Sequence, residues 1–118
     1  MAENEPFDRE IKRGTLELLL LRLVSEKRSY GYELVTDLHE RSGGWIELKE
    51  GTLYPVLYRL EDAGLIAAEW DQPSRGVPRK YYKITAKGKK RLDQLTTSWQ
   101  AWVRVVNEVL EGPEGGTE

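Results

Sequence analysis

A helix that runs directly into two short strands constrains this fold more than any other segment of the sequence. In residues 49–63 the apolar side chains recur at helical spacing, which places four of them on one inward face: Leu53, Val56, Leu57 and Leu60. Gly64 follows, as glycine often does just past a helix end. Residues 65–70 and 80–84 have strand composition and are joined by a turn rich in proline, glycine and serine. This order predicts a helix followed by a β-hairpin, or wing.

Positive charge is concentrated on that hairpin and on the segment after it. Residues 75–91 contain eight lysines and arginines and no acidic residue, whereas the whole chain has a formal charge of −2. The other residues therefore carry about −10, which predicts a local polyanion-binding site on an otherwise acidic protein. For the last four basic residues, a solvated helix face explains the pattern as well as DNA contact does: Lys87, Lys89, Lys90 and Arg91.

Size and composition exclude several classes of protein. The 118 residues suffice for one domain with a modest core. Cysteine is absent, which excludes disulfides and thiolate chemistry and favours a reducing compartment. The longest apolar run, residues 18–21, is too short to cross a membrane, and the acidic start lacks the basic residues of an export signal. We therefore expect a cytoplasmic protein with no membrane partner.

Two helices are expected before the helix–hairpin unit and one after it. Residues 7–25 and about 31–42 have helical patterns, and Thr85 is a candidate cap for a last helix that reaches about residue 110. The predicted fold class is mainly α with a small β part (α+β). It consists of a winged helix-turn-helix domain with a two-stranded wing (1–84), a long C-terminal dimerisation helix (85–111) and a disordered tail (112–118).

The first and last helices each carry an apolar seam that one winged-helix core cannot cover. In the first helix the seam has a 4-3-4-3 spacing, formed by Phe7, Ile11, Gly14, Leu18 and Leu21. In the last helix the spacing is 3-4-3-4-3, formed by Leu92, Leu95, Trp99, Trp102, Val106 and Val109. Heptad-like seams predict a homodimer. We expect its interface to contain Phe7, Ile11, Leu18, Leu21, Leu95, Trp99, Trp102 and Val106.

The outward face of the helix over residues 49–63 suits a DNA groove. With Leu53 at the centre of the buried face, a rotation of about 100° per residue points four residues outward: Gly51, Pro55, Tyr58 and Asp62. Thr52, Tyr54 and Arg59 lie on the flanks, where hydroxyl and guanidinium groups reach bases or phosphates. For an isolated helix, boundary tyrosines and a solvated Arg59 would be the simpler interpretation. The basic hairpin next in the sequence favours DNA.

Three ordered blocks of sequence stand at specific spacings. They are Tyr30-Gly31-Tyr32-Glu33-Leu34; Gly51-Thr52-Leu53-Tyr54-Pro55 with Arg59-Leu60-Glu61 and Gly64-Leu65-Ile66; and Pro78-Arg79-Lys80-Tyr81-Tyr82 with Ile84-Thr85 and Gly88. In these blocks the chain resembles the PadR family of bacterial transcriptional regulators. The single C-terminal helix is similar to that of its smaller subfamily.

The resemblance implies a sequence-specific DNA-binding regulator, a ligand-released repressor that acts as a homodimer on a palindromic operator. Together, the residues and the resemblance predict DNA contacts from Tyr32, Lys49, Thr52, Tyr54, Pro55, Tyr58, Arg59, Arg75, Arg79 and Lys80. Lys49 stands where the family often has a Ser or Asn helix cap. The alternative is a winged helix that has become a protein-interaction module without DNA binding.

Trp99 and Trp102 occupy consecutive positions of the last seam. Across a twofold axis, Trp99 and its symmetry mate can sandwich a flat aromatic molecule. Because several small members of the resembled family respond to phenolic or planar aromatic compounds, we expect an effector site formed by Trp99, Trp102 and Leu18. Packing in the dimer interface is the alternative for both tryptophans. Trp45 and Trp70 are expected to pack in the core or in turns.

No catalytic residue, metal site or cofactor is expected. The sole histidine, His39, lies on the second predicted helix beside Asp37 and Glu40, with no nucleophile or glycine-rich phosphate loop near it. A solvated surface histidine is the simplest interpretation, and metal-ligand spacing is not visible in the sequence.

Overall fold

The computed structural model describes residues 6–113, with side chains described from residue 15 onward. Within these residues the order is α1 (Pro6–Glu26), β1 (Ser29–Tyr30), α2 (Gly31–Arg41), α3 (Glu50–Asp62), β2 (Ile66–Asp71), β3 (Arg79–Ile84) and α4 (Ala86–Glu111). The mainly α winged-helix fold class is confirmed, and the expected helices and hairpin strands end within one residue of their predicted bounds. From residue 114 on, the expected disordered tail lies outside the described residues.

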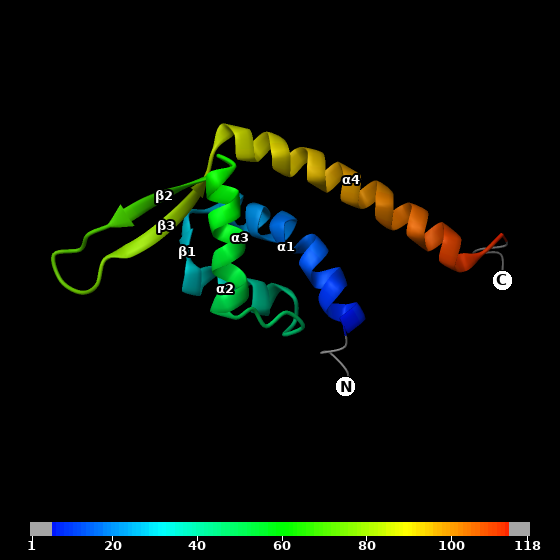
Figure 1. The fold of residues 1–118 in the computed structure, drawn as a ribbon, viewed down its shortest axis with the longest axis horizontal. Coiled ribbons are helices and arrows are strands. Elements are labelled where there is room, and N and C mark those ends of the chain that lie inside the picture. Colours follow the sequence, from blue (N-terminus) through cyan, green and yellow to red (C-terminus); the bar gives the residue numbers. More distant parts are fainter. Residues whose placement is uncertain (1–5, 114–118) are drawn as a thin grey trace.

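The sheet has three strands, one more than the expected two-stranded wing. β1 pairs antiparallel with β3, with Ser29 opposite Tyr82 and Tyr30 opposite Tyr81, so the strand order is β1-β3-β2. A strand of two residues is too short to show alternation, and the sequence there indicates only a break between helices. β2 and β3 continue past β1 as the wing, which projects at the left of Figure 1.

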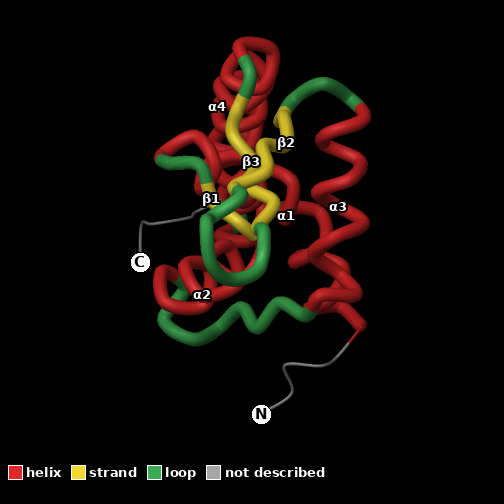
Figure 2. Tube along the Cα trace, turned by 90° about the vertical axis from the view of Figure 1, so that its left-hand side faces the viewer, coloured by secondary structure: helices red, strands yellow, loops and turns green. Residues whose placement is uncertain are grey.

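The core lies between the helices and one face of the sheet. Its buried side chains include Leu20 and Val24 of α1, Leu34 of α2, Leu57 of α3 and Tyr82 of β3. Burying these large apolar groups provides most of the stability of a domain of this size. Figure 2, which views the molecule from the wing end, shows α3 beside the sheet with α2 below it.

Leu21 belongs to this core, so its predicted place in the dimer interface is wrong. Its side chain is 0% exposed, like that of its neighbour Leu20. α1 contacts α2, α3, β3 and α4, and its closely spaced residues Leu20, Leu21, Leu23 and Val24 are all buried, so this part of the helix is apolar around much of its circumference. The outer seam of α1 therefore ends at Leu18, which is half-buried.

α4 begins with a tight attachment to the end of α3. The Thr85 hydroxyl donates to the Gly64 carbonyl at 2.7 Å and accepts from the Gly88 N–H at 3.0 Å, which caps the helix as predicted. Lys87 donates to the Ala63 carbonyl at 2.8 Å and thereby caps α3. Beyond this clamp, α4 runs along α1 and then extends away from the body (Figure 1). No helix in residues 6–113 is long and apolar enough to cross a membrane.

Candidate nucleic-acid interface

α3 presents the face expected of a DNA-reading helix. Leu53, Val56, Leu57 and Leu60 are buried. The outward side chains are exposed: those of Thr52, Pro55, Tyr58 and Arg59. Lys49 is the cap residue, and its side chain makes no capping hydrogen bond, so the helix start depends on backbone bonds such as Thr52 N–H to the Lys49 carbonyl at 2.9 Å. The predicted orientation of this helix is confirmed.

Tyr54 braces the two helices of the helix-turn-helix. It is half-buried, and a methyl group added at Gly31 would lie 2.3 Å from its hydroxyl oxygen. Burial, with the nearby Glu50 carboxylate, raises the pKa of Tyr54 above 10.0. Its ring lies 5.9 Å from that of Tyr58, centroid to centroid. Tyr54 thus packs beside Tyr58 and helps to position its ring. This role is in addition to the predicted DNA contact of Tyr54.

The basic residues of the wing lie on opposite sides of it. In the hairpin register, Trp70 pairs with Lys80 and Asp71 pairs with Arg79. Directly paired residues share a face and successive residues alternate, so Lys80 lies on the same face as buried Tyr82, and Arg79 lies on the other. The prediction grouped Arg79 and Lys80 as equivalent contacts, and this register separates them. Arg75 is exposed in the turn between the strands.

Lys80 connects the wing to α3. Its ammonium lies 3.6 Å from a Glu61 carboxylate oxygen and 5.5 Å from the centroid of the Tyr58 ring. Burial opposes the charged form, but Tyr82 and Glu61 outweigh burial and raise the pKa of Lys80 above 10.5. The positive charge is therefore retained at neutral pH in the corner between the two elements.

The outer face of the sheet is held by a ladder of cations and aromatic rings. Arg28 lies over the Tyr81 ring at 4.1 Å, and Arg79 lies over the Tyr30 ring at 4.6 Å. The Tyr30 and Tyr81 rings meet edge to face at 5.3 Å. Such contacts stabilise by about 0.5–1 kcal/mol each at exposed sites. Arg79 therefore has a structural partner, which connects the base of the wing to the start of α2.

Two large exposed side chains were missed from the sequence. Trp70 is 59% exposed and Trp45 is 67% exposed, so the expectation that both pack in the core or in turns is wrong. Trp70 lies where the hairpin has passed the edge of the core, and Trp45 lies in the loop between α2 and α3. The register of Trp70 opposite Lys80 is the signal that would have identified it as part of the wing surface.

Tyr32, at the start of α2, is 71% exposed, as a DNA contact requires.

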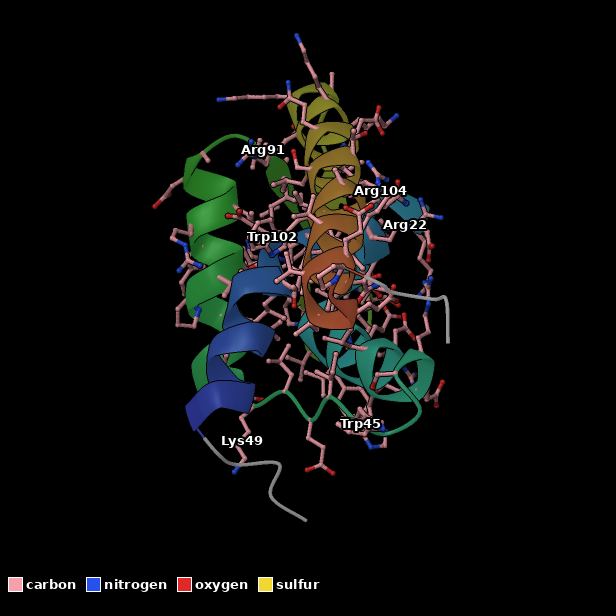
Figure 3. The ribbon with its side chains drawn as sticks, turned by 90° about the vertical axis from the view of Figure 1, so that its right-hand side faces the viewer. Arg22, Trp45, Lys49, Arg91, Trp102 and Arg104 are labelled. Atoms are coloured by element: carbon pink, nitrogen blue, oxygen red, sulfur yellow. The ribbon has the colours of Figure 1, made fainter. Side chains whose placement is uncertain are left out.

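The predicted effector residues lie together in a groove between α1 and α4. Leu18, Trp99 and Trp102 line a space of about 230 Å³ whose other walls are Thr15, Glu17, Leu95 and Ser98. Trp102 is labelled between these helices in Figure 3. Of the remaining interface predictions, Val106 is half-buried, and the side chains of Phe7 and Ile11 lie outside the described residues. The groove is open, so a single chain covers only part of any ligand.

The described residues contain no cluster of histidine and carboxylate side chains able to hold a metal ion. His39 is exposed on α2, with its Nε2 atom 3.9 Å from a Glu47 carboxylate oxygen.

Known proteins share this sequence and fold. The profile of the transcriptional regulator PadR-like family matches residues 20–94. A transcriptional regulator of Mycobacterium tuberculosis is 33% identical over 104 residues, which are 88% of this chain and 91% of the relative. The crystal structure of a PadR family transcriptional regulator from Eggerthella lenta is 38% identical, with a TM-score of 0.80 over 88% of each chain.

A PadR-like transcriptional regulator from Bacillus cereus has a solved structure with 37% identity and a TM-score of 0.76, over 87% of this chain and 98% of that one. These similarities cover both the corner of α3 with the wing and most of α4. The chain therefore belongs to the PadR-like family of transcriptional regulators, which are not enzymes.

Proposed function

We propose that this regulator binds a palindromic operator as a homodimer and represses transcription until a small aromatic ligand releases it. The observation that carries the proposal is the corner where the exposed face of α3 and the inner side of the wing meet through Lys80. An α-helix fits the major groove of B-DNA. With α3 there, we place the wing at the adjacent minor groove. Tyr58, Thr52 and Pro55 face the bases in this arrangement.

Binding to the gene's own upstream region tests the DNA-binding part. We expect fluorescence anisotropy to show affinity about 10³-fold or more higher for this duplex than for a scrambled one. The logarithm of the affinity should fall with the logarithm of salt concentration by about 0.9 per neutralised phosphate. A protein-interaction module predicts neither preference nor slope, so equal affinity for both duplexes would contradict the proposal.

The exposed apolar side chains of α4 support a homodimer. Trp99, Trp102, Val105, Val109 and Leu110 are all exposed, on a helix that extends away from the body in Figure 1. A contiguous apolar surface of this kind marks an interface. A twofold pairing through α4 and α1 would place two α3 helices on one duplex, where successive major grooves are about 34 Å apart.

The groove between α1 and α4 supports the effector part. Closing it with a second subunit brings two copies of Trp99 and Trp102 around the same space, which suits a flat aromatic molecule. A ligand there alters the spacing of the α3 helices and is thereby coupled to DNA release.

A panel of planar cationic dyes and phenolic acids tests this coupling. We expect at least one compound to quench tryptophan emission, raise the melting temperature and release the operator. Trp99→Ala should abolish the response, whereas Trp45→Ala, a change far from the groove, should retain it. Unchanged fluorescence together with full operator binding across the panel would contradict the effector site.

A further inference from the structure

Trp70 is a large apolar side chain exposed at a specific place. Along the inner face of β2, Ile66 is buried, Ala68 is half-buried and Trp70 is 59% exposed. The hairpin has left the core at this point, and the indole has Lys80 directly opposite it on β3. An exposed indole offers a binding partner a large apolar surface to cover.

The two faces of the wing differ in chemistry at the level of Trp70, which indicates the kind of partner that the inner face fits. Glu69 and Asp71, the acidic residues of β2, lie on the outer face, where Glu69 is bound by Arg28 at 2.9 Å and by Lys83 at 3.4 Å. The inner face at the same level carries Trp70 and the Lys80 ammonium. The ammonium is paired with the Glu61 carboxylate of α3 at 3.6 Å. The surface is thus a flat apolar ring beside an ammonium donor, and it complements a sugar–phosphate chain, which has apolar sugar faces and anionic phosphates.

The proposed docking geometry brings such a chain to this position. When α3 occupies the major groove and the wing turn occupies the next minor groove, one sugar–phosphate strand separates the two grooves. That strand must pass through the corner formed by α3 and the inner side of the wing, whose surface is Tyr58, Lys80 and Trp70. The indole N–H supplies a hydrogen-bond donor, and the ring supplies a flat apolar face.

We infer that Trp70 is a DNA-contacting residue that packs its indole ring on a deoxyribose of this strand and donates its N–H to a phosphate oxygen. The inference rests on the proposed function, because it uses the same corner. The contact between the indole ring and the deoxyribose is mainly apolar. Its contribution therefore differs in kind from that of the basic residues, since it does not release counterions.

Trp70→Ala and Trp70→Phe, measured against the operator at several salt concentrations, test the inference. We expect Trp70→Ala to lower affinity about tenfold at every salt concentration while the salt slope stays that of the wild type. Trp70→Phe keeps a flat ring and should recover part of the loss. Trp45→Ala is the matched control: its indole is also exposed, but it lies in the α2–α3 loop, labelled in Figure 3 on the side away from the wing.

Tryptophan emission supplies a second measurement that does not depend on affinity. Operator binding should change the emission of wild-type protein, and this change should be smaller in Trp70→Phe at saturating DNA. If Trp70→Ala folds and binds like the wild type, the inference is overturned while the proposed function stands. If the wild type itself shows no preference for its operator, the proposed function fails first.

Discussion

At the scale of single residues, two glycines decide how closely neighbouring elements approach. A methyl group at Gly31 would meet the Tyr54 hydroxyl at 2.3 Å. A methyl group at Gly88 would meet the Leu65 carbonyl oxygen at 2.0 Å and the Ile84 side chain at 2.8 Å. Tyr54 can move its ring end, whereas the Leu65 carbonyl is backbone and cannot yield without moving β2. Gly88 is therefore the stricter requirement.

Gly88→Ala should destabilise the protein by about 2–3 kcal/mol, because overpacking against backbone forces a shift of α4 relative to the sheet. Gly51→Ala is the matched control, since a methyl group there meets nothing within 4 Å. It should be neutral or stabilise by about 0.5–1 kcal/mol through a smaller loss of chain entropy on folding. Urea unfolding measures both changes, and equal midpoints for the two variants would refute the close-approach argument.

The Glu69 carboxylate should titrate below its ordinary range. A hydrogen bond from Arg28 and the charge of Lys83 lower the pKa of Glu69 from 4.5. Because the folded-state pKa is depressed, this group adds stability above its unfolded pKa, and the contribution is lost as the pH falls through the folded value. In a carboxyl NMR titration, Arg28→Ala should move the Glu69 midpoint up toward 4.5.

Glu26 provides the internal reference for that titration. Its pKa is also lowered, chiefly by Arg41, which Arg28→Ala leaves in place. The Glu26 midpoint should therefore stay where it is. A shift of both midpoints would indicate a global change of fold rather than loss of one ion pair.

At the scale of elements, the basic residues of the wing have different roles, although the sequence does not distinguish them. Arg75 is exposed in the turn, Arg79 stacks on Tyr30, and Lys80 joins the wing to α3. Lys87 caps α3 and so belongs to the scaffold. The cluster of positive charge is thus only partly available to a polyanion, and Arg75 in the turn is one of its exposed cations.

Arg75→Ala should weaken binding to operator and scrambled DNA by the same factor and reduce the salt slope by about 0.9, as expected for loss of one phosphate contact. Lys83→Ala removes the same charge from the outer face of β3, where Lys83 contacts Glu69 at 3.4 Å. It should leave the slope nearly unchanged. Identical slopes for the two variants would contradict the assignment of Arg75 to the DNA-facing side.

At the scale of the whole molecule, one chain is more extended than a finished globular domain. Its radius of gyration is 17.0 Å. A compact chain of this length has about 13.5 Å. Both the wing and α4 project beyond the body, and α4 carries exposed apolar residues (Figure 1). The proposed homodimer would cover these exposed residues of α4.

Val109→Asp should shift the proposed homodimer to monomer, because it places a charge at the last position of the apolar α4 seam. Val77→Asp is the matched control: Val77 is 78% exposed in the wing turn, and Val109 is 73% exposed on α4. Analytical ultracentrifugation over a range of concentrations distinguishes the two. A dimer that tolerates Val109→Asp as well as Val77→Asp would exclude the far end of α4 from the interface.

Local patterns in the sequence predicted the helices, the hairpin and the face of α3, since Leu53, Val56, Leu57 and Leu60 recur with the period of a helix. Glycine and threonine at helix ends predicted the bounds for the same local reason. These features depend on residues a few positions apart, which is the range over which periodicity and capping operate.

Contacts between distant segments were decided only by the tertiary structure. Leu21 is buried because α1 packs against four other elements, and Ser29 joins the sheet because β3 lies beside it. The register of the hairpin places Arg79 and Lys80 on opposite faces of the wing. Trp70 is exposed because the hairpin has left the core at that residue. Periodicity predicts on which face of a helix or strand a residue lies. Which segment covers that face depends on residues far away in the sequence.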